Sequence, residues 1–210
     1  MGLTALDTAT VSDALDRLGL AGQALGVRPL DPAMRVSGPA FTVAMLPVGA
    51  DGGTVGDYID EVPEGAVVVI DARGRSDATV WGDLLTTAAR RRGVAGTVVD
   101  GVCRDSARSR ELGYPLFARG TAMRTGKARL QMMATRVPVA LGRILVRPGD
   151  WILGDADGVV VVPADRRSRV ETVAARIAAA EDRIRRAVEN GERLVDARRS
   201  GGYHDLQSAR

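Results

Sequence analysis

Two short runs of apolar residues constrain the fold more than any other feature of the chain. Residues 66–71 read Ala-Val-Val-Val-Ile-Asp, and residues 94–99 read Val-Ala-Gly-Thr-Val-Val. A run without alternation of apolar and polar residues is typical of a strand buried on both faces. Residues 86–92 between the runs have a helical pattern, which Gly93 ends. This order of strand, helix and strand favours an α/β fold.

Periodicity, glycines and prolines predict the remaining elements. We expect an N-terminal helix at 10–18, capped by Thr10 or Ser12. We expect further helices at residues 54–62, 105–112 and 164–195, the last interrupted at Asn190-Gly191. Strands are expected at residues 36–46 (broken by Gly38-Pro39), 143–146, 151–153 and 159–162, and loops at 26–32 and 73–76.

The scarcity of three residue types limits the chemistry. Lys127, His204 and Cys103 are each the single residue of their kind, and His204 lies in an expected C-terminal tail. A Ser-His-Asp triad or a multi-histidine zinc site would need His204, so we expect neither. One cysteine excludes an internal disulfide framework and fits a cytoplasmic location. If the chain is an enzyme, carboxylates and arginines do most of the work, and carboxylate and water ligands suit Mg²⁺ or Mn²⁺.

Charge and hydropathy make two further classes of partner, nucleic acids and membranes, less favoured. The formal net charge of +3 arises after residue 164, where arginines and acids are interspersed. That pattern favours a solvated helix face over a nucleic-acid-binding surface. No apolar run is long enough to span a bilayer, and the first residues lack the pattern of a secretory signal, so we expect neither a membrane span nor a leader.

Both ends of the stretch from residue 82 to residue 105 carry candidate site residues. Gly82-Asp83-Leu84-Leu85 opens the predicted helix, where free N–H groups and the helix dipole favour a bound carboxylate or phosphate. At the other end, Arg104 can bind a carboxylate through two hydrogen bonds, and Asp105 can ligate a cation. Each residue also has a structural explanation, since both acids can cap helices and the arginine can form a surface ion pair.

The spacing of these residues resembles a known signature. Asp83 is followed, after twenty residues, by Arg104-Asp105, within Gly-Asp-Leu-Leu and Val-Asp-Gly-x-x-Arg-Asp. This pattern resembles the class II pyruvate aldolases of the RraA-like family, specifically the 4-hydroxy-4-methyl-2-oxoglutarate / 4-carboxy-4-hydroxy-2-oxoadipate aldolases. The resemblance covers roughly residues 7–165 and includes residues 11–15, Arg119-Gly120, Thr125-Gly126-Lys127, 146–150 and 155–163.

The resemblance implies an architecture. The fold is expected to be of the swivelling β/β/α (RraA-like) kind, with one aldolase domain at residues 1–165. Residues 166–210 would form a C-terminal helix and tail, packed on that domain or on a neighbouring subunit. The family also implies a homotrimer or a dimer of trimers, with sites at the subunit interfaces.

The resemblance also implies a role for each candidate residue. Asp105 would hold Mg²⁺ or Mn²⁺, largely through waters, and Asp83 would orient a metal-bound water that relays the proton. The pyruvate part of the substrate would be bound by Arg104 and by the N–H groups of Gly82, Asp83, Leu84 and Leu85. A neighbouring subunit could add an acid to the metal, for which Glu189 and Glu192 are candidates.

The implied reaction agrees with the composition. Cleavage of a 4-hydroxy-2-oxo acid to pyruvate and a second oxoacid leaves a pyruvate enolate, whose charge needs a lysine Schiff base or a metal ion. A Schiff base could use only Lys127, in a Thr-Gly-Lys loop. Composition and motif therefore agree on a metal-dependent route. Oxaloacetate decarboxylation is expected as a side activity, because it passes through the same enolate.

Other functions stay open. The chain could be a non-enzymatic protein that binds ribonuclease E, like the inhibitors in the family, although those lack the acid that Asp105 provides here. It could be a related lyase for a different oxoacid, in which Arg73 and Arg75 reach an extra carboxylate, although we expect a solvated loop there. A methyltransferase is disfavoured, because no Gly-x-Gly-x-x-Gly follows a strand. Asp155-x-Asp157-Gly158 resembles the start of a calcium loop but lacks its later acids, so we expect a turn.

Overall fold

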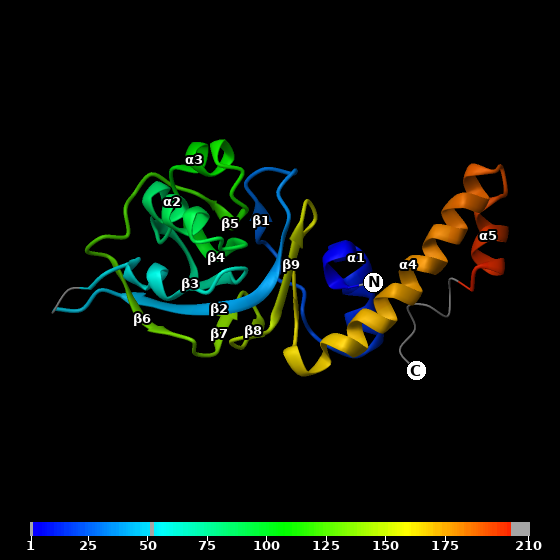
Figure 1. The fold of residues 1–210 in the computed structure, drawn as a ribbon, viewed down its shortest axis with the longest axis horizontal. Coiled ribbons are helices and arrows are strands. Elements are labelled where there is room, and N and C mark those ends of the chain that lie inside the picture. Colours follow the sequence, from blue (N-terminus) through cyan, green and yellow to red (C-terminus); the bar gives the residue numbers. More distant parts are fainter. Residues whose placement is uncertain (1, 51–52, 203–210) are drawn as a thin grey trace.

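The computed structural model describes residues 2–50 and 53–202, and His204 therefore lies outside the described residues. One large sheet has the strand order β1-β5-β4-β3-β2-β9-β10, with β6 paired to β2, and β7 and β8 form a small second sheet. Helices flank the large sheet, and the C-terminal helices project from the body of the protein (Figure 1). This arrangement confirms the predicted α/β fold class.

The strands are β1 (Arg28–Pro29), β2 (Val36–Pro47), β3 (Val67–Thr79), β4 (Gly96–Cys103), β5 (Leu116–Thr121), β6 (Leu130–Thr135), β7 (Val139–Leu141), β8 (Ile144–Val146), β9 (Trp151–Asp155) and β10 (Gly158–Val162). The α-helices are α1 (Thr8–Arg17), α2 (Asp83–Arg91), α3 (Ser106–Glu111), α4 (Arg167–Glu189) and α5 (Leu194–Ser200). Three short 3-10 helices are η1 (Leu3–Ala5), η2 (Asp57–Glu61) and η3 (Ala164–Arg166).

The two apolar runs form adjacent parallel strands at the centre of the large sheet. β2, β3, β4 and β5 pair in parallel, and every residue of β4 is buried. In β3, Val68 and Ile70 belong to one buried cluster, whereas Val67 and Val69 belong to a second. Both faces of β3 are therefore covered, as the absence of alternation predicted.

β2 is continuous through Gly38-Pro39, where a break was expected. Residues 36–39 pair antiparallel with β9, and residues 40–44 pair parallel with β3. One long, curved strand thus joins two parts of the sheet (Figure 1). Pro39 lies where the pairing changes partner, a position at which a missing N–H donor is tolerated.

β3 also continues through residues 73–76, where a loop was expected. Its register with β4 shifts twice in this region. Arg73 and Gly74 both have positive φ, and the Asp71 carboxylate accepts a hydrogen bond from the Arg73 N–H at 2.9 Å. Such irregular pairing bends a strand without ending it. The chain reaches Thr79 at the edge of the sheet where β4 also ends.

α1 begins earlier than predicted and has a different N-cap residue. α1 begins at Thr8, and its N-cap is Asp7, which accepts a hydrogen bond from the Thr10 N–H at 2.7 Å. The N–H and hydroxyl of Thr8 donate to the two oxygens of Asp155 at 2.8 and 2.6 Å. Asp155 also accepts from the Asp157 N–H at 3.0 Å. The Asp155-x-Asp157-Gly158 motif is therefore a turn between β9 and β10, as expected, and it also anchors α1, which the sequence did not predict.

We predict that Asp155→Asn lowers the free energy of unfolding by about 1–3 kcal/mol at neutral pH, because an amide cannot accept all three hydrogen bonds. Burial raises the pKa of Asp155, but the hydrogen bonds from Thr8 and Asp157 outweigh it and hold the pKa below its ordinary value. A lowered folded pKa stabilises the protein above the unfolded pKa of about 4, and this contribution is lost as the pH falls through the folded value.

Urea denaturation of both proteins from about pH 7 to about pH 3 checks this. The difference in unfolding free energy between wild type and Asp155→Asn should shrink as the pH falls below about 4. A difference that stays constant over this range would show that the charge of Asp155 contributes nothing.

α4 packs on α1 and then extends beyond it. Val170, Ala174 and Ile177 join Val11 and Leu15 in a buried cluster. The C-terminal part of α4 continues past α1 and lies beside α5 (Figure 1). The two helices are separated after Asn190, as the sequence predicted, while a domain boundary at residue 165 stays a prediction. Within residues 2–50 and 53–202, no helix combines the length and apolar character needed to cross a bilayer.

Candidate active site

The candidate site lies where β3 and β4 end and where α2 and α3 begin. The Arg104 N–H donates to the Trp81 carbonyl at 3.0 Å, and the Val80 N–H donates to the Val102 carbonyl at 3.4 Å. These bonds hold the two chain segments side by side. Gly82–Leu85 and Arg104-Asp105, distant in sequence, are thereby brought together, because parallel strands end at the same edge of the sheet.

Asp105 adopts an unusual backbone conformation. Its φ of 55° and ψ of 35° lie in the left-handed region, which disfavours most residues other than glycine but which aspartate tolerates better than most. Its side chain makes no capping hydrogen bond to α3. Instead, Oδ2 accepts the Asp83 N–H at 3.3 Å and lies 3.3 Å from Arg104 Nε. The side chain of Asp105 thus accepts a hydrogen bond from the N-terminus of α2 and does not cap α3.

Gly82 permits this close approach. A Cβ atom at residue 82 would lie 2.8 Å from Asp105 Oδ2 and 3.3 Å from Arg104 Nε. Its backbone is extended, so the requirement is for space and not for a special φ. Gly126 has a similar role, because a Cβ there would collide with the carbonyl of Thr79. Both glycines of the motifs are explained by packing at the site.

Asp83 is the first residue of α2, and its N-cap is Gly82, so the expected capping role is only partly present. Asp83 Oδ1 accepts the Leu84 N–H at 2.8 Å. Two N–H groups of the first turn therefore already bind carboxylates, one from Asp105 and one from Asp83. The N–H groups of Gly82 and Leu85 have no acceptor among the described residues. This helix end is suited to anions.

A cleft of about 490 Å³ opens beside the N-terminus of α2. Its wall includes every residue predicted to bind the substrate: Gly82, Asp83, Leu84, Leu85 and Arg104. A second wall, which sequence reasoning missed, comes from residues 55–60 around η2. The only signal in the sequence was a pair of acids, Asp57 and Asp60, on either side of apolar residues.

Asp105 is not among the residues that line the cleft, but it contacts two that are, Asp83 and Arg104. Its side chain fits a hard divalent cation. No group of three or more His, Cys, Asp or Glu side chains with metal-site geometry occurs within residues 2–50 and 53–202. The Asp105 side chain is 38% exposed, and its Oδ1 accepts no hydrogen bond from any described residue. One carboxylate oxygen open to solvent, completed by waters, is a ligand set that Mg²⁺ and Mn²⁺ accept. These residues can hold the ion only as a water-rich complex unless another chain adds an acid.

Other residues of the signature have structural roles. The buried Asp100 of β4 accepts hydrogen bonds from Arg119 Nε and, at 3.0 Å, from the Gly142 N–H. These two hydrogen bonds of Asp100 connect β4 with β5 and with the β7–β8 hairpin. Arg75 forms two hydrogen bonds with Asp77, at 2.8 and 2.7 Å, and neither Arg73 nor Arg75 lines the cleft. The two arginines are therefore not placed to bind a second carboxylate in this cleft.

The single cysteine, Cys103, precedes Arg104 but is not a nucleophile. It is buried, and burial raises the pKa of its thiol to about 11. A thiol with this pKa is protonated at neutral pH, and the thiolate is the reactive form. Carboxylates and arginine are therefore the chemical groups of this site.

The family model RraA-like, described as Aldolase/RraA, matches residues 8–161. The chain belongs to the RraA-like family. It is 40% identical over 200 residues to protein DlpA of Legionella pneumophila, a match that covers 94% of this chain and 32% of DlpA. The chain thus spans about a third of the length of that relative.

Two further comparisons bear on function. The chain is 35% identical over 192 residues to a protein of Halalkalibacterium halodurans named "Putative 4-hydroxy-4-methyl-2-oxoglutarate aldolase", covering 91% of this chain and 89% of that protein. The structure of Streptomyces coelicolor RraAS2, described as an unusual member of the RNase ES inhibitor RraA family, matches with a TM-score of 0.80 and 35% identity, over 86% of this chain and 92% of that one. These comparisons confirm the predicted RraA-like family and fold.

Proposed function

We propose that this RraA-like protein is a divalent-metal-dependent aldolase that cleaves a 4-hydroxy-2-oxo acid to pyruvate and a second oxoacid. The name of the Halalkalibacterium halodurans relative supports the reaction class. The observation that carries the proposal is the convergence of three groups: Asp83 and Arg104 line the cleft, and Asp105, which is not among its lining residues, contacts both. Asp105 Oδ2 lies 3.3 Å from both the Asp83 N–H nitrogen and Arg104 Nε, beside the N-terminus of α2.

Arg104 and the first turn of α2 would bind the carboxylate of the substrate. The Arg104 side chain is 39% exposed and lines the cleft. Its guanidinium can form two parallel hydrogen bonds with a carboxylate, which fixes the orientation of the neighbouring 2-oxo group. The N–H groups of Gly82 and Leu85, at the positive end of the helix dipole, can add further donors.

Asp83 would handle the proton. Asp83 lines the cleft, and its Oδ2 accepts no hydrogen bond from a described residue. In the proposed reaction, a water held by Asp83 takes the proton of the C4 hydroxyl as the C3–C4 bond breaks. The electron pair of that bond passes to C3 and forms the pyruvate enolate. Protonation of C3 then gives pyruvate.

Asp105, with waters, would hold the cation. When bound there, Mg²⁺ or Mn²⁺ would supply positive charge at the enolate oxygen, which is worth several kcal/mol of stabilisation. Decarboxylation of oxaloacetate gives the same enolate, so we also propose this side activity.

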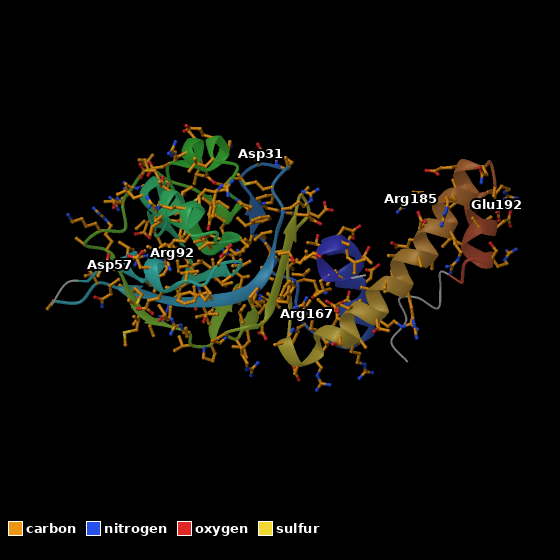
Figure 2. The ribbon with its side chains drawn as sticks, viewed as in Figure 1. Asp31, Asp57, Arg92, Arg167, Arg185 and Glu192 are labelled. Carbon is orange, nitrogen blue, oxygen red and sulfur yellow. The ribbon has the colours of Figure 1, made fainter. Side chains whose placement is uncertain are left out.

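We also propose that the protein forms a homotrimer or a dimer of trimers, with subunit contacts near the cleft. Leu84, at the cleft, is 80% exposed, and Met123, two residues after the end of β5, is 88% exposed. Large exposed apolar side chains favour a protein–protein contact, and of these two only Leu84 lines the cleft. Glu189 and Glu192 lie at the far end of the projecting helices, where Figure 2 labels Glu192. They stay candidates for an acid supplied to the metal of a neighbouring subunit.

Release of pyruvate, followed with lactate dehydrogenase, tests the proposed function. Pyruvate should form from 4-hydroxy-4-methyl-2-oxoglutarate, 4-carboxy-4-hydroxy-2-oxoadipate or a related 4-hydroxy-2-oxo acid, and from oxaloacetate, when Mg²⁺ is present. The similarity to RraAS2 favours one second candidate, a regulator that binds ribonuclease E. Capture of ribonuclease E by a protein that releases no pyruvate from these compounds would favour that candidate.

A further inference from the structure

A second groove, of about 420 Å³, lies between the C-terminus of α1 and the first half of α4. It shares no lining residue with the candidate active-site cleft, and Figure 1 shows α1 and α4 beyond β9, on the side away from α2. Three arginines and no acid line the groove, whose lining residues are Arg17, Leu18, Arg169, Thr172, Val173 and Arg176. The groove is therefore positively charged.

The charges of α4 are interspersed in sequence but separated on the helix. Arg169 and Arg176 are seven residues apart, so at about 3.6 residues per turn they lie on one side of α4. By the same spacing, Glu171 and Asp182 lie near the opposite side. Each of these acids forms an ion pair with another arginine of α4, at 3.0 and 2.5 Å. The two acids therefore do not neutralise the groove.

The groove has guanidinium groups that no other residue engages. Arg169 and Arg176 are exposed, and neither forms a hydrogen bond or an ion pair with any residue of 2–50 or 53–202. Arg169 is in the first turn of α4, at the positive end of that helix dipole. Arg17, which is half-buried, is in the last turn of α1 and offsets the negative end of that dipole. A concave surface of this kind concentrates positive potential and attracts anions.

The groove also has an apolar part. Leu18 and Val173 pack against the buried cluster of α1, α4 and β10, and both stay partly exposed. The Thr172 hydroxyl donates to the Ser168 carbonyl at 2.9 Å, so its oxygen can still accept a hydrogen bond. The volume of the groove falls within the range of about 300–1,000 Å³ that is typical of small-molecule sites. These features suit an organic anion better than a single inorganic ion.

We propose that this groove binds an organic polyphosphate, a small molecule in which linked phosphate groups carry a larger organic group. The Cα atoms of Arg169 and Arg176 are about 10 Å apart along the helix, so their long side chains can reach one phosphate chain from its two ends. Each guanidinium can bind phosphate oxygens through two hydrogen bonds. The organic group would contact Leu18 and Val173. A nucleoside triphosphate has this chemistry.

Isothermal titration calorimetry with ATP, without added metal and at about 50 mM salt to limit screening, tests the proposal. We expect one site per chain, and we expect Arg169→Gln/Arg176→Gln to weaken binding about thirtyfold or more. Glutamine keeps the helix propensity, so this variant should fold as wild type does, which thermal unfolding checks. Tripolyphosphate, which lacks the nucleoside, should bind at least about threefold more weakly than ATP.

Two control variants separate the groove from other positive charge. Arg185→Gln/Arg186→Gln removes the same charge from α4 outside the groove (Figure 2 labels Arg185), and Arg104→Gln removes the arginine of the candidate active site. Both should bind ATP within about twofold of wild type. Absence of binding to wild type up to about 1 mM ATP, or an equal loss in either control, would overturn the proposal. Tripolyphosphate that binds as tightly as ATP would overturn the assignment to an organic ligand.

Discussion

Replacement of Asp105 by glycine is expected to reduce metal-dependent pyruvate release by about a thousandfold or more. The carboxylate is the proposed protein ligand of the metal, and its loss removes the charge stabilisation of the enolate. Glycine is chosen because Asp105 has a φ of 55°, which alanine would adopt only with strain. The variant therefore removes the ligand without distorting the start of α3.

Asp105→Asn is the matched control for shape. Asparagine also tolerates the left-handed conformation and can accept the hydrogen bond from the Asp83 N–H, but it carries no charge. We expect it to fold as wild type does and still to lose about a hundredfold or more in kcat/KM. Full turnover by either variant, measured with lactate dehydrogenase at saturating Mg²⁺, would remove Asp105 from the mechanism.

Replacement of Arg104 by lysine is expected to lower kcat/KM by about 30-fold to 100-fold. Lysine keeps the positive charge but not the planar fork that binds a carboxylate through two hydrogen bonds. Because product and substrate share the pyruvate carboxylate, the inhibition constant for pyruvate should rise as well. A structural role alone would not change that constant.

Arg108→Lys is the control for this substitution. Arg108 lies on the neighbouring α3 and pairs with Glu111 at 2.8 Å, with both side chains exposed. Surface pairs of this kind contribute little, so kcat/KM should stay within about twofold of wild type. If Arg104→Lys behaves like this control in both kcat/KM and pyruvate inhibition, the substrate carboxylate is bound elsewhere.

The core of the fold was predictable because burial imposes a local pattern. The run at residues 67–70 has no alternation, and β3 is indeed covered on both faces. The continuity of β2 was not predictable, because Gly38-Pro39 is a typical break and only pairing with β9 and β3 keeps the strand intact. The sequence predicted that α1 begins at residue 10, whereas it begins at Thr8, because a long-range contact again decides the structure. Asp155, distant in sequence, supplies acceptors that Thr8 requires.

The candidate site was likewise predictable in one part and not in another. Gly82–Leu85 and Arg104-Asp105 form a motif with fixed spacing, and parallel strands bring its two ends to one edge of the sheet. The η2 wall comes from a separate segment with no motif, so its contribution appears only once the chain is folded. The pairing of Asp105 with the N-terminus of α2 was also hidden, because it depends on the left-handed conformation of Asp105 and on the space beside Gly82.

The central claim is that Asp105 holds a divalent cation that pyruvate release requires. The most direct test is to remove metal from wild type and Asp105→Gly with EDTA, to dialyse both, and to assay each before and after addition of Mg²⁺ or Mn²⁺. We predict that wild type loses pyruvate release from a 4-hydroxy-2-oxo acid on metal removal and regains it on addition, whereas Asp105→Gly is inactive throughout. Undiminished pyruvate release by wild type in excess EDTA would contradict the claim.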